Sequence, residues 1–492
     1  MADESLKEEI LINVTPSEVR AALLENGVLQ EVYIERSVRR GLNSNIYKGR
    51  VLRVLPGMQA AFVDIGLERT AFLHASDIAA NRIENGSSEP PNIRDLVREG
   101  DEIMVQVVKD PLGNKGARLT TLVTLPSRHV VLLPYSDVVG ISARIEDDEE
   151  RERLRVIAED ILAARGLSCG AIVRTVAEGM DRDALEADLS YTIKLWEVVK
   201  ERYSQSCVKE LVHEDLSLPL RVLRDMVTSD IERILVDSED DFHSMRDFAD
   251  TYLPHIDPAL ELYKRRRPIF DMHGIEDEIR RSLDRNIPLK SGGYLIFDQT
   301  EAMTTVDINT GGYVGHRNLE ETIYRTNLEA AVAIARQLRL RNLGGIIIID
   351  FIDMEEAEHR ANVLQVLEQS MARDHARHQI MPVSPLGLVE MTRKRTRESL
   401  QHILCEDCPS CAGRGFVMTA ETVCFEIFRE IIRQSRQFEF DEVLVLAHQD
   451  VIELLLDEQA RSFAELEEQT GKSIRLQTES LYLQDQFDVV LM

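Results

Sequence analysis

The sequence predicts a multidomain α/β protein that contains a small OB-type β-barrel near its N-terminus. Three observations lead to this fold class. The chain has 492 residues, 44% of them apolar, which is enough for several hydrophobic cores. About five short strands with Gly and Pro turns follow residue 39, as in an OB-type barrel. Further along, a strand, a long helix and a second strand follow one another, which indicates an α/β core.

The first elements are predicted to be strands. In "ILINVTPSEVRAALLENGVLQEVYIER", apolar and polar residues alternate on both sides of "ENG", which is typical of a β-hairpin. The barrel strands come from "GLNSNIYKGRVLRVLPGMQAAFVDIGLERTAFLHASDI" and "GDEIMVQVVKDPLGNKGARLTT", with "AANRIENGSSEPPNI" as an exposed loop between them. Residues 122–218 mix strand-like "RHVVLLPY" and "GAIVRTV" with charged helical runs such as "EDDEERERLRVIAEDILAARG".

The second half begins with charged helices from about residue 219. Two strands then come from "GGYLIFDQTEAMTTVDINTGGYVG", a helix is predicted over about 319–340, and "GGIIIIDFIDM" is predicted to be a strand buried on both faces. After a cluster of cysteines, "TAETVCFEIFREIIRQSRQF" predicts an amphipathic helix and "DEVLVLAH" a strand. Residues 416–492 are therefore expected to form a small terminal unit.

The charge balance limits the function classes. With 86 acidic and 58 basic residues the net charge is −28, which argues against the basic surface of a nonspecific nucleic-acid coat. Binding to RNA or DNA would need local basic sites, and the candidates are "YKRRRP" (263–268), "RQLRLR" (336–341) and "TRKRTR" (392–397). The third is favoured because it precedes the cysteines; a solvated helix face is the alternative for each. Neither a signal peptide nor a membrane-spanning apolar run is evident, so we expect a cytoplasmic protein.

Two aspartates and an asparagine are the candidate catalytic residues. Asp307 and Asn309 are two residues apart in "MTTVDINTG", so a strand places both on one face. Asp350 follows the isoleucines of "GGIIIIDFIDM", where the strand leaves the core and a charge needs a partner. Asp353 points to the opposite face if that strand continues, and is left out of the site. For Asp350 alone, a helix cap or a salt bridge is the alternative.

The chemistry of this set indicates a metal. Two carboxylates on neighbouring strands, with no His or Cys nearby in the sequence, provide the oxygen ligands that Mg²⁺ or Mn²⁺ prefers over nitrogen or sulfur. Such a metal lowers the pKa of its bound water and neutralises a phosphodiester oxygen in the transition state. The site therefore predicts phosphodiester hydrolysis, with Asn309 orienting a ligand or a water.

The cysteines form a second candidate metal site. Cys405, Cys408 and Cys411 occur at three-residue intervals in "HILCEDCPSCAGRGF", and the chain has only six cysteines, too few for a disulfide framework. The nearby Pro and Gly residues favour a metal-binding knuckle over free thiols. A structural zinc takes four ligands, however, and no second CxxC pair in the sequence completes the set.

Long runs of the sequence closely resemble the ribonuclease E/G family. They are "KSGGYLIFDQTEAMTTVDINTG", "RQLRLRNLGGIIIIDFIDM" and "GLVEMTRKRTRESL" followed by "CPSC", and the resemblance covers essentially the whole chain. The runs "INVTPSE", "GVLQEVYIER" and "QFDVVLM" are more similar to the ribonuclease G branch. The resemblance implies a single-strand-specific endoribonuclease that cleaves A/U-rich RNA with Mg²⁺, leaves 5′-monophosphate and 3′-hydroxyl ends, and is stimulated by a 5′-monophosphate. Processing of rRNA precursors and decay of mRNA are the implied roles.

The resemblance also implies an architecture, in which an S1 (OB-type) barrel is inserted in an RNase H-like subdomain and a DNase I-like catalytic subdomain follows. The implied segments are 1–38 and 219–281 for the RNase H-like subdomain, 39–121 for the S1 domain, 122–218 for a 5′ sensor region, 282–404 for the DNase I-like subdomain, 405–415 for a zinc-link and 416–492 for a small C-terminal α/β domain.

Roles for individual residues follow from the resemblance. Asp307 and Asp350 match the magnesium-binding aspartates and Asn309 the assisting asparagine, the same residues that the strand argument selects. Phe62 and Phe72 match rings that stack or pack on RNA bases. The remaining implied RNA contact, near the scissile region, is Lys115. From the alternation in "AAFVDI" alone, Phe62 would be a barrel core residue.

The resemblance further implies a phosphate pocket. Arg174 and Thr175 of "IVRT" would bind the 5′-terminal phosphate, and Val131 would help line the pocket. Ser127 aligns with a further pocket position but departs from the ribonuclease E pattern. A solvent-facing arginine at a strand end is the structural alternative for Arg174.

For the cysteines, the resemblance implies a zinc shared between two chains, each supplying Cys408 and Cys411, in a homodimer or homotetramer. Cys405 could instead complete a three-thiol site within one chain. Two other functions compete with the endoribonuclease: a noncatalytic RNA-binding adaptor built on the S1 domain, and a magnesium-dependent DNase. The intact set of Asp307, Asn309 and Asp350 argues against the adaptor, and the S1-like barrel argues against the DNase.

Overall fold

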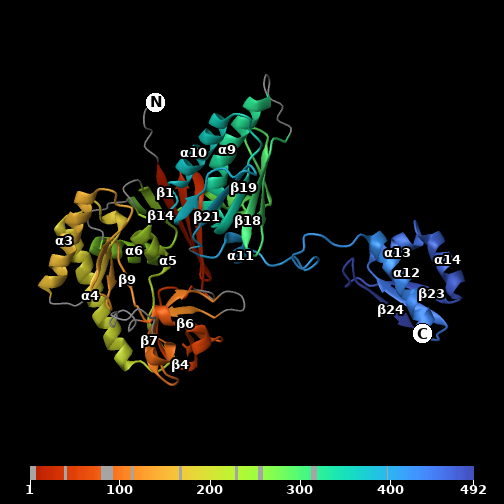
Figure 1. The fold of residues 1–492 in the computed structure, drawn as a ribbon, viewed down its shortest axis with the longest axis horizontal. Coiled ribbons are helices and arrows are strands. Elements are labelled where there is room, and N and C mark those ends of the chain that lie inside the picture. The colour runs from red at the N-terminus through yellow and green to blue at the C-terminus, as the bar shows by residue number, and fades with distance from the viewer. Residues whose placement is uncertain are drawn as a thin grey trace. The chain divides into compact units, whose positions relative to one another are not determined.

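The computed structural model describes residues 7–37, 41–78, 92–111, 116–165, 169–227, 231–252, 259–311, 319–395 and 397–492. The chain divides into two compact units, which we call unit 1 (Met1–Leu400) and unit 2 (Gln401–Met492) (Figure 1). The short helix α11 (Leu400–Leu404) spans the boundary. Within the described ranges, no helix has both the length and the apolar content that a membrane span requires.

The first sheet of unit 1 joins two distant stretches of the chain. Its strands and neighbouring helices are β1 (Glu8–Val14), β2 (Glu18–Glu25), β3 (Val28–Arg36), β14 (Ile231–Val236), β15 (Ala259–Leu262), α5 (Leu218–Asp225), α6 (Glu239–Tyr252), α7 (Ile269–Met272) and α8 (Ile275–Arg281). The strand order is β15-β14-β1-β2-β3, with β1 parallel to β14. Asn26 and Gly27 form a two-residue turn in which both φ angles are positive, 49° and 76°, as a tight hairpin requires. The hairpin predicted around "ENG" is confirmed.

The second sheet closes into a five-strand barrel. It comprises β4 (Ile46–Leu55), β5 (Ala60–Asp64), β6 (Ala71–His74), β7 (Glu102–Lys109) and β8 (Arg118–Thr120), with β13 (Leu211–His213), α2 (Ile93–Leu96), and the 3₁₀ helices η1 (Pro56–Met58) and η2 (Ala75–Asp77). β4 pairs with both β5 and β7, which closes the ring. Ala61 and Val63 of β5 point into the barrel core, so Phe62 between them points outward. The interior position that alternation alone predicts for Phe62 is therefore wrong.

A small third sheet, in the order β11-β12-β10-β9, packs against two long helices. Its elements are β9 (Leu125–Pro126), β10 (Val130–Leu133), β11 (Val139–Ile141), β12 (Gly170–Val173), α3 (Asp148–Ala164), α4 (Arg182–Gln205) and the 3₁₀ helix η3 (Thr175–Ala177). α3 begins where the sequence predicts it: the Asp147 side chain accepts from the Glu149 N–H, and acidic residues fill the first turn.

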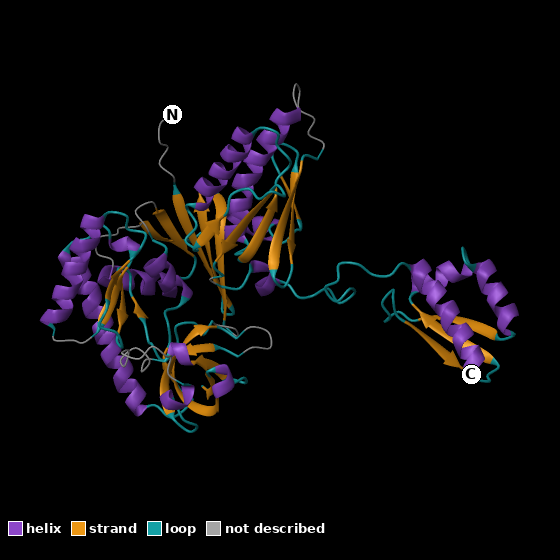
Figure 2. Ribbon diagram, viewed as in Figure 1, coloured by secondary structure: helices purple, strands orange, loops and turns teal. Residues whose placement is uncertain are grey.

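The fourth sheet carries the candidate catalytic residues. Its elements are β16 (Asn286–Pro288), β17 (Tyr294–Gln299), β18 (Met303–Asn309), β19 (Gly345–Asp350), β20 (His378–Ile380), β21 (Leu388–Arg393), α9 (Leu319–Leu340) and α10 (Ala357–Met371). The order is β16-β17-β18-β19-β21-β20, and α9 connects the parallel strands β18 and β19. α9 and α10 pack side by side and share one core with the sheet (Figure 2).

Only one face of β19 is fully buried. Ile347 and Ile349 lie in the core with the helices, whereas Ile348 is half-buried and Ile346 is 47% exposed. The expectation that this strand is buried on both faces is wrong, because α9 and α10 pack against the face that carries Ile347 and Ile349.

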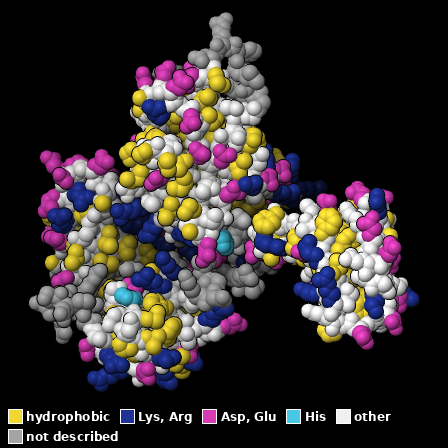
Figure 3. Space-filling view, turned by 45° about the vertical axis from the view of Figure 1, so that its right-hand side comes forward, with side chains coloured by type: hydrophobic (Ala, Val, Ile, Leu, Met, Phe, Trp, Pro, Cys, Tyr) yellow, Lys and Arg dark blue, Asp and Glu magenta, His cyan; other side chains and the backbone are white. Residues whose placement is uncertain are grey.

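Two of the three basic stretches contain arginines that are buried within the fold. Arg339 is buried and donates to Glu25 and Glu31 on the first sheet. In "TRKRTR", Arg393 is buried against Asp374, and Arg397 lies over a tyrosine ring. The preference for this stretch as a nucleic-acid contact is wrong for Arg393, since its buried charge is already paired within the fold. On the face drawn in Figure 3, a group of Lys and Arg side chains lies just left of the centre of the view, and elsewhere basic and acidic side chains are interspersed.

Unit 2 is a small α/β domain with its own core. It comprises α12 (Ala420–Gln437), β22 (Glu442–Ala447), α13 (Gln449–Leu456), α14 (Ala460–Thr470), β23 (Ser473–Thr478) and β24 (Phe487–Leu491). The central strand β22 is parallel to β23 and antiparallel to β24. Apolar residues of the three helices and three strands form the core, so the predicted helix and strand after the cysteines are confirmed.

Candidate active site

The three candidate catalytic residues lie together on one face of the fourth sheet. Asp307 and Asn309 are on β18, and the Asn309 amide donates to Asp307 Oδ2 at 2.8 Å. Asp350 is the last residue of β19 and the register partner of Asp307. All three alternate with buried residues of their strands, so their side chains point away from α9 and α10. They occupy the carboxyl edge of two parallel strands, where α/β sheets commonly bind ligands.

The electrostatics of this edge favour a cation. Burial raises the pKa of the Asp350 carboxyl, and the negative charges of Asp307 and Asp353 raise it further. β19 ends at Asp350, so Asp353 is not on a continuing strand, and its charge acts on Asp350. The expectation that Asp353 points away from the site rested on a longer strand.

The donor set fits Mg²⁺. This ion commonly binds through one or two carboxylates and keeps several waters. Asp307 and Asp350 would supply the carboxylates, and the amide of Asn309 donates a hydrogen bond to the first of them. In the described part of the chain, no three Asp, Glu, His or Cys side chains come together as a metal site, so these two aspartates have no third protein ligand of that kind.

The two phenylalanines lie side by side on the outside of the barrel. Phe62 of β5 and Phe72 of β6 are cross-strand partners, with ring centroids 6.2 Å apart in an edge-to-face arrangement. The His74 ring lies 6.4 Å from that of Phe72. Both phenylalanines are half-buried, which leaves part of each ring available for stacking. Lys115, the third residue of this set, lies outside the described residues.

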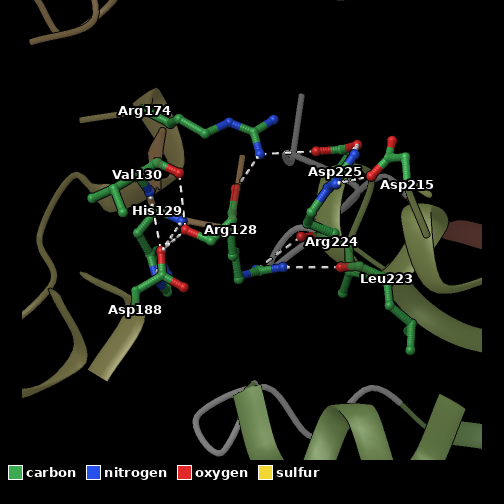
Figure 4. Close-up of polar contacts among 11 residues, drawn as sticks. Arg128, His129, Val130, Arg174, Asp188, Asp215, Leu223, Arg224 and Asp225 are labelled. Carbon is green, nitrogen blue, oxygen red and sulfur yellow. Dashed lines mark hydrogen bonds and ion pairs between the residues drawn. The ribbon is translucent and has the colours of Figure 1, made fainter. Parts of the chain in front are cut away.

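The residues of the implied phosphate pocket lie on or next to β10 and β12. Figure 4 shows Arg174 and its polar contacts. Arg174 directly follows β12, and its Nη1 donates to Asp225 Oδ1 at 2.8 Å and to the Ser127 carbonyl at 2.7 Å. The Thr175 hydroxyl is hydrogen-bonded to the hydroxyl of Ser142, and Val131 is half-buried on β10. The Ser127 hydroxyl is buried and donates to a carboxylate of α4 at 2.6 Å, so it is already used within the fold.

Arg174 is part of a larger charged network (Figure 4). Asp225 also accepts a hydrogen bond from Arg224 at 2.9 Å. Burial would raise the pKa of Asp225, but the charges and hydrogen bonds of Arg224 and Arg174 outweigh this effect, so its pKa is lowered. Arg128 is only 5% exposed and donates to two backbone carbonyls at and beyond the end of α5. Burial lowers the pKa of Arg128 to about 10. A terminal phosphate at Arg174 would therefore compete with the Asp225 carboxylate.

The cysteine cluster lies at the start of unit 2. Cys405 and Cys408 are exposed and Cys411 is half-buried. The N–H groups of Cys411 and Ser410 donate to the Cys408 sulfur and lower the pKa of its thiol. The Gly415 N–H donates to Cys411 Sγ at 3.3 Å. In the described ranges, Cys405, Cys408 and Cys411 do not lie together as a group of three side chains that could hold a metal.

Comparison with known proteins identifies the family. A model of the Ribonuclease E/G family matches residues 124–396, more than half of the chain. The chain belongs to this family. Two further domain models match other parts of the chain. An S1 RNA binding domain matches residues 44–121, which contain the closed barrel, and an RNase E/G thioredoxin-like domain matches residues 407–491 in unit 2.

Family members align over nearly the whole chain. Ribonuclease G of Salmonella typhimurium (strain SL1344) is 53% identical over 489 residues, which are 98% of this chain and 99% of that protein. Ribonuclease G of Escherichia coli (strain K12) aligns with the same identity and coverage. Ribonuclease E of the same strain is 38% identical over 459 residues, which are 92% of this chain and 43% of the longer relative.

Sequence reasoning missed three residues near these sites. From the sequence, Asp353 is left out of the site because the strand is assumed to continue beyond Asp350. The strand ends at Asp350, so strand alternation does not determine the direction of the Asp353 side chain. Asp225 lies 51 residues from Arg174, and no local pattern links them. Arg128 precedes a buried strand as a single basic residue, a pattern that carries no specific signal.

Proposed function

We propose that this protein is a Mg²⁺-dependent endoribonuclease that cleaves single-stranded, A/U-rich RNA in rRNA maturation and mRNA decay. The observation that carries the proposal is the register pair Asp307 and Asp350, with Asn309 hydrogen-bonded to Asp307 at 2.8 Å. The family relationship supports the same reaction class: relatives covering nearly the whole chain bear the name ribonuclease G.

In the proposed reaction, water attacks the scissile phosphorus and the bond from phosphorus to the 3′ oxygen breaks. The 3′ oxygen takes up a proton, so the products carry a 3′-hydroxyl and a 5′-monophosphate. Asp307 and Asp350 would hold the Mg²⁺, which lowers the pKa of water and offsets charge on the phosphate. Asn309 keeps the Asp307 carboxylate in one orientation through its hydrogen bond.

RNA binding in this proposal uses two surfaces away from the carboxylates. The half-exposed rings of Phe62 and Phe72 stack on bases, together with Lys115. Arg174 and Thr175, with Val131 beside them, bind a 5′-terminal monophosphate and thereby stimulate cleavage. The match of residues 44–121 to an S1 RNA binding domain supports the first of these surfaces.

We also propose that Cys408 and Cys411 bind zinc together with the same pair of a second chain, so that the enzyme is a homodimer or a pair of dimers. Two cysteines in a CxxC spacing supply half of a four-thiolate site, which supports a shared ion.

The test is cleavage of a short A/U-rich RNA that carries a 5′-monophosphate, and of its 5′-hydroxyl twin, with and without Mg²⁺. We expect Mg²⁺-dependent internal cuts, faster on the monophosphate, that are lost in Asp350→Asn while folding and RNA binding are retained. Glu301→Gln, an exposed carboxylate in the turn before β18, is the matched control and should cleave normally. Binding without cleavage by the wild type would instead support a noncatalytic adaptor.

A further inference from the structure

A groove opens directly beyond Asp350, at the carboxyl edge of β18 and β19. Its volume is about 440 Å³, which falls in the range of roughly 300–1,000 Å³ that small-molecule sites occupy. Three parts of the chain line it: the segment after β19, the first half of α10, and the loop before β21 with the start of that strand. The lining comprises residues 351–354, Arg360, Val363, Leu364, 383–387 and Val389.

Hydrogen bonds hold the walls of this groove in place. On one wall, the buried Asn327 of α9 donates to the Ile352 carbonyl at 2.8 Å and accepts from the Ile352 N–H at 3.2 Å. Arg360 donates to two further carbonyls of the same wall. On the opposite wall, the Gly387 N–H donates to the Ser384 carbonyl at 2.9 Å. The groove is therefore formed before any ligand binds.

The chemistry of the lining suits a flat ring with N–H donors. Met354, Leu364 and Val383 supply partly buried apolar surface, which favours the face of an aromatic ring. Asp353 is an exposed carboxylate of the same lining and can only accept hydrogen bonds when ionised. Its charge also acts on Asp350, so the groove and the carboxylate pair are neighbours.

We propose that this groove is a subsite for one base of the RNA strand next to the scissile phosphate, and that Asp353 favours a base with an exocyclic amino group over uracil there. The inference rests on the proposed function, because it needs the phosphate to lie at Asp307 and Asp350. A carboxylate accepts a hydrogen bond from the amino group of adenine, cytosine or guanine, whereas uracil has no such group.

The experiment uses one 5′-monophosphorylated RNA with a single cleavage site, in which each nucleotide flanking the site is replaced in turn by an abasic ribose. We expect kcat/KM of the wild type to fall about tenfold for one position at a fixed distance from the cut, the size of a base contact. Leu364→Trp fills the groove. Its kcat/KM on the parent RNA should be lower than that of the wild type by about the same factor, and should not fall further on the abasic RNA.

Gln365→Trp is the matched control. It adds the same ring to the next residue of α10, which is exposed and outside the groove lining, and should keep the wild-type pattern. A second variant, Asp353→Asn, changes an exposed residue and leaves the groove open. It should reduce the ratio of the cleavage rates on the adenine and uracil substrates at the sensitive position, because a neutral amide accepts a hydrogen bond less strongly than a carboxylate.

The outcomes separate this inference from the proposed function. If the wild type cleaves every abasic RNA equally, or if folded Leu364→Trp keeps the wild-type base dependence, the groove is not a base subsite although the enzyme is an endoribonuclease. Should Leu364→Trp fail to fold, an unchanged base preference in Asp353→Asn rejects the assignment of that residue. A wild type that cleaves no RNA would refute the proposed function itself, and the subsite with it.

Discussion

At the scale of single residues, Asn309 differs from the two aspartates because it acts through one of them. Its amide donates to Asp307 Oδ2 at 2.8 Å and fixes the orientation of that carboxylate. We expect Asn309→Ala to lower cleavage by about 10- to 100-fold and to shift the Mg²⁺ dependence to higher concentration. The measurement is the cleavage rate across a Mg²⁺ titration. Thr305→Ala, on the same face of β18, should behave as wild type, and an unshifted Mg²⁺ midpoint in Asn309→Ala would contradict this role.

The buried pair of Asp374 and Arg393 predicts a pH dependence of stability. Arg393 Nε donates to Asp374 Oδ2 at 2.6 Å. Burial would raise the pKa of Asp374, but the hydrogen bond and the charge of Arg393 outweigh it, so the pKa lies below its usual value. The pair therefore stabilises unit 1 fully above the unfolded-state pKa of about 3.9. That contribution is lost as the pH falls through the lower folded-state pKa.

We expect Asp374→Asn to lower the free energy of unfolding by roughly 3–5 kcal/mol, because a buried guanidinium loses its counter-charge. Urea unfolding between about pH 3 and 7 should show a constant difference from wild type above about pH 4 and a shrinking one below it. Asp160→Asn removes a partner from an exposed pair with Arg182 and should cost only about 0–1 kcal/mol. If the difference in the free energy of unfolding between wild type and Asp374→Asn grew towards acid pH, the predicted direction of the pH dependence would be wrong.

At the scale of elements, the end of β19 is positioned by α9. The Asn327 side chain satisfies both backbone groups of Ile352, two residues beyond Asp350. Asn327→Ala would leave these groups without their partner, at a cost of roughly 1–3 kcal/mol for each buried one. We expect faster hydrogen exchange over 351–354 and a lower kcat. Asn362→Ala, which removes a hydrogen bond to Tyr324, is the control, and equal effects of both variants would argue against a specific role of Asn327.

The end of α5 controls a different site. Asp225 pairs with Arg174 and, in the proposed function, would compete with a 5′-phosphate for this arginine. Asp225→Asn removes its negative charge, so we expect the ratio of cleavage rates on 5′-monophosphate and 5′-hydroxyl RNA to rise by about fivefold, from an exposed-pair energy of about 1 kcal/mol. Glu178→Gln, an exposed carboxylate just after η3, should leave the ratio unchanged. A lower ratio would mean that Asp225 positions Arg174 instead of competing for it.

At the scale of the whole molecule, features with a local signal could be predicted from the sequence. The turn at Asn26 and Gly27 and the apolar periodicity of α9 and α12 are visible within short windows. The pairing of Asp307 with Asp350 was also accessible, because two strands joined by one helix place their carboxyl ends at the same edge.

Features that depend on distant packing could not be predicted. Arg339 pairs with Glu31, which is 308 residues earlier in the chain. From the sequence alone, its basic stretch therefore looks like a solvent-exposed surface. The same holds for Ile346, whose exposure depends on which face of the sheet the helices cover. Partner choice at long range is set by tertiary packing, and a single sequence carries no periodic signal for it.

The cysteines extend the argument from one chain to an assembly. Cys408 and Cys411 provide two thiolates, and a four-coordinate zinc needs two more, which a second chain would supply. We expect about one zinc for every two chains, and a loss of both zinc and dimer in Cys408→Ser or Cys411→Ser. Metal analysis and light scattering after size-exclusion chromatography measure these quantities. Cys405→Ser should retain zinc and mass, since Cys405 belongs to no three-donor group in the described ranges. Loss of zinc in Cys405→Ser, with the dimer intact, would instead place that thiol among the ligands.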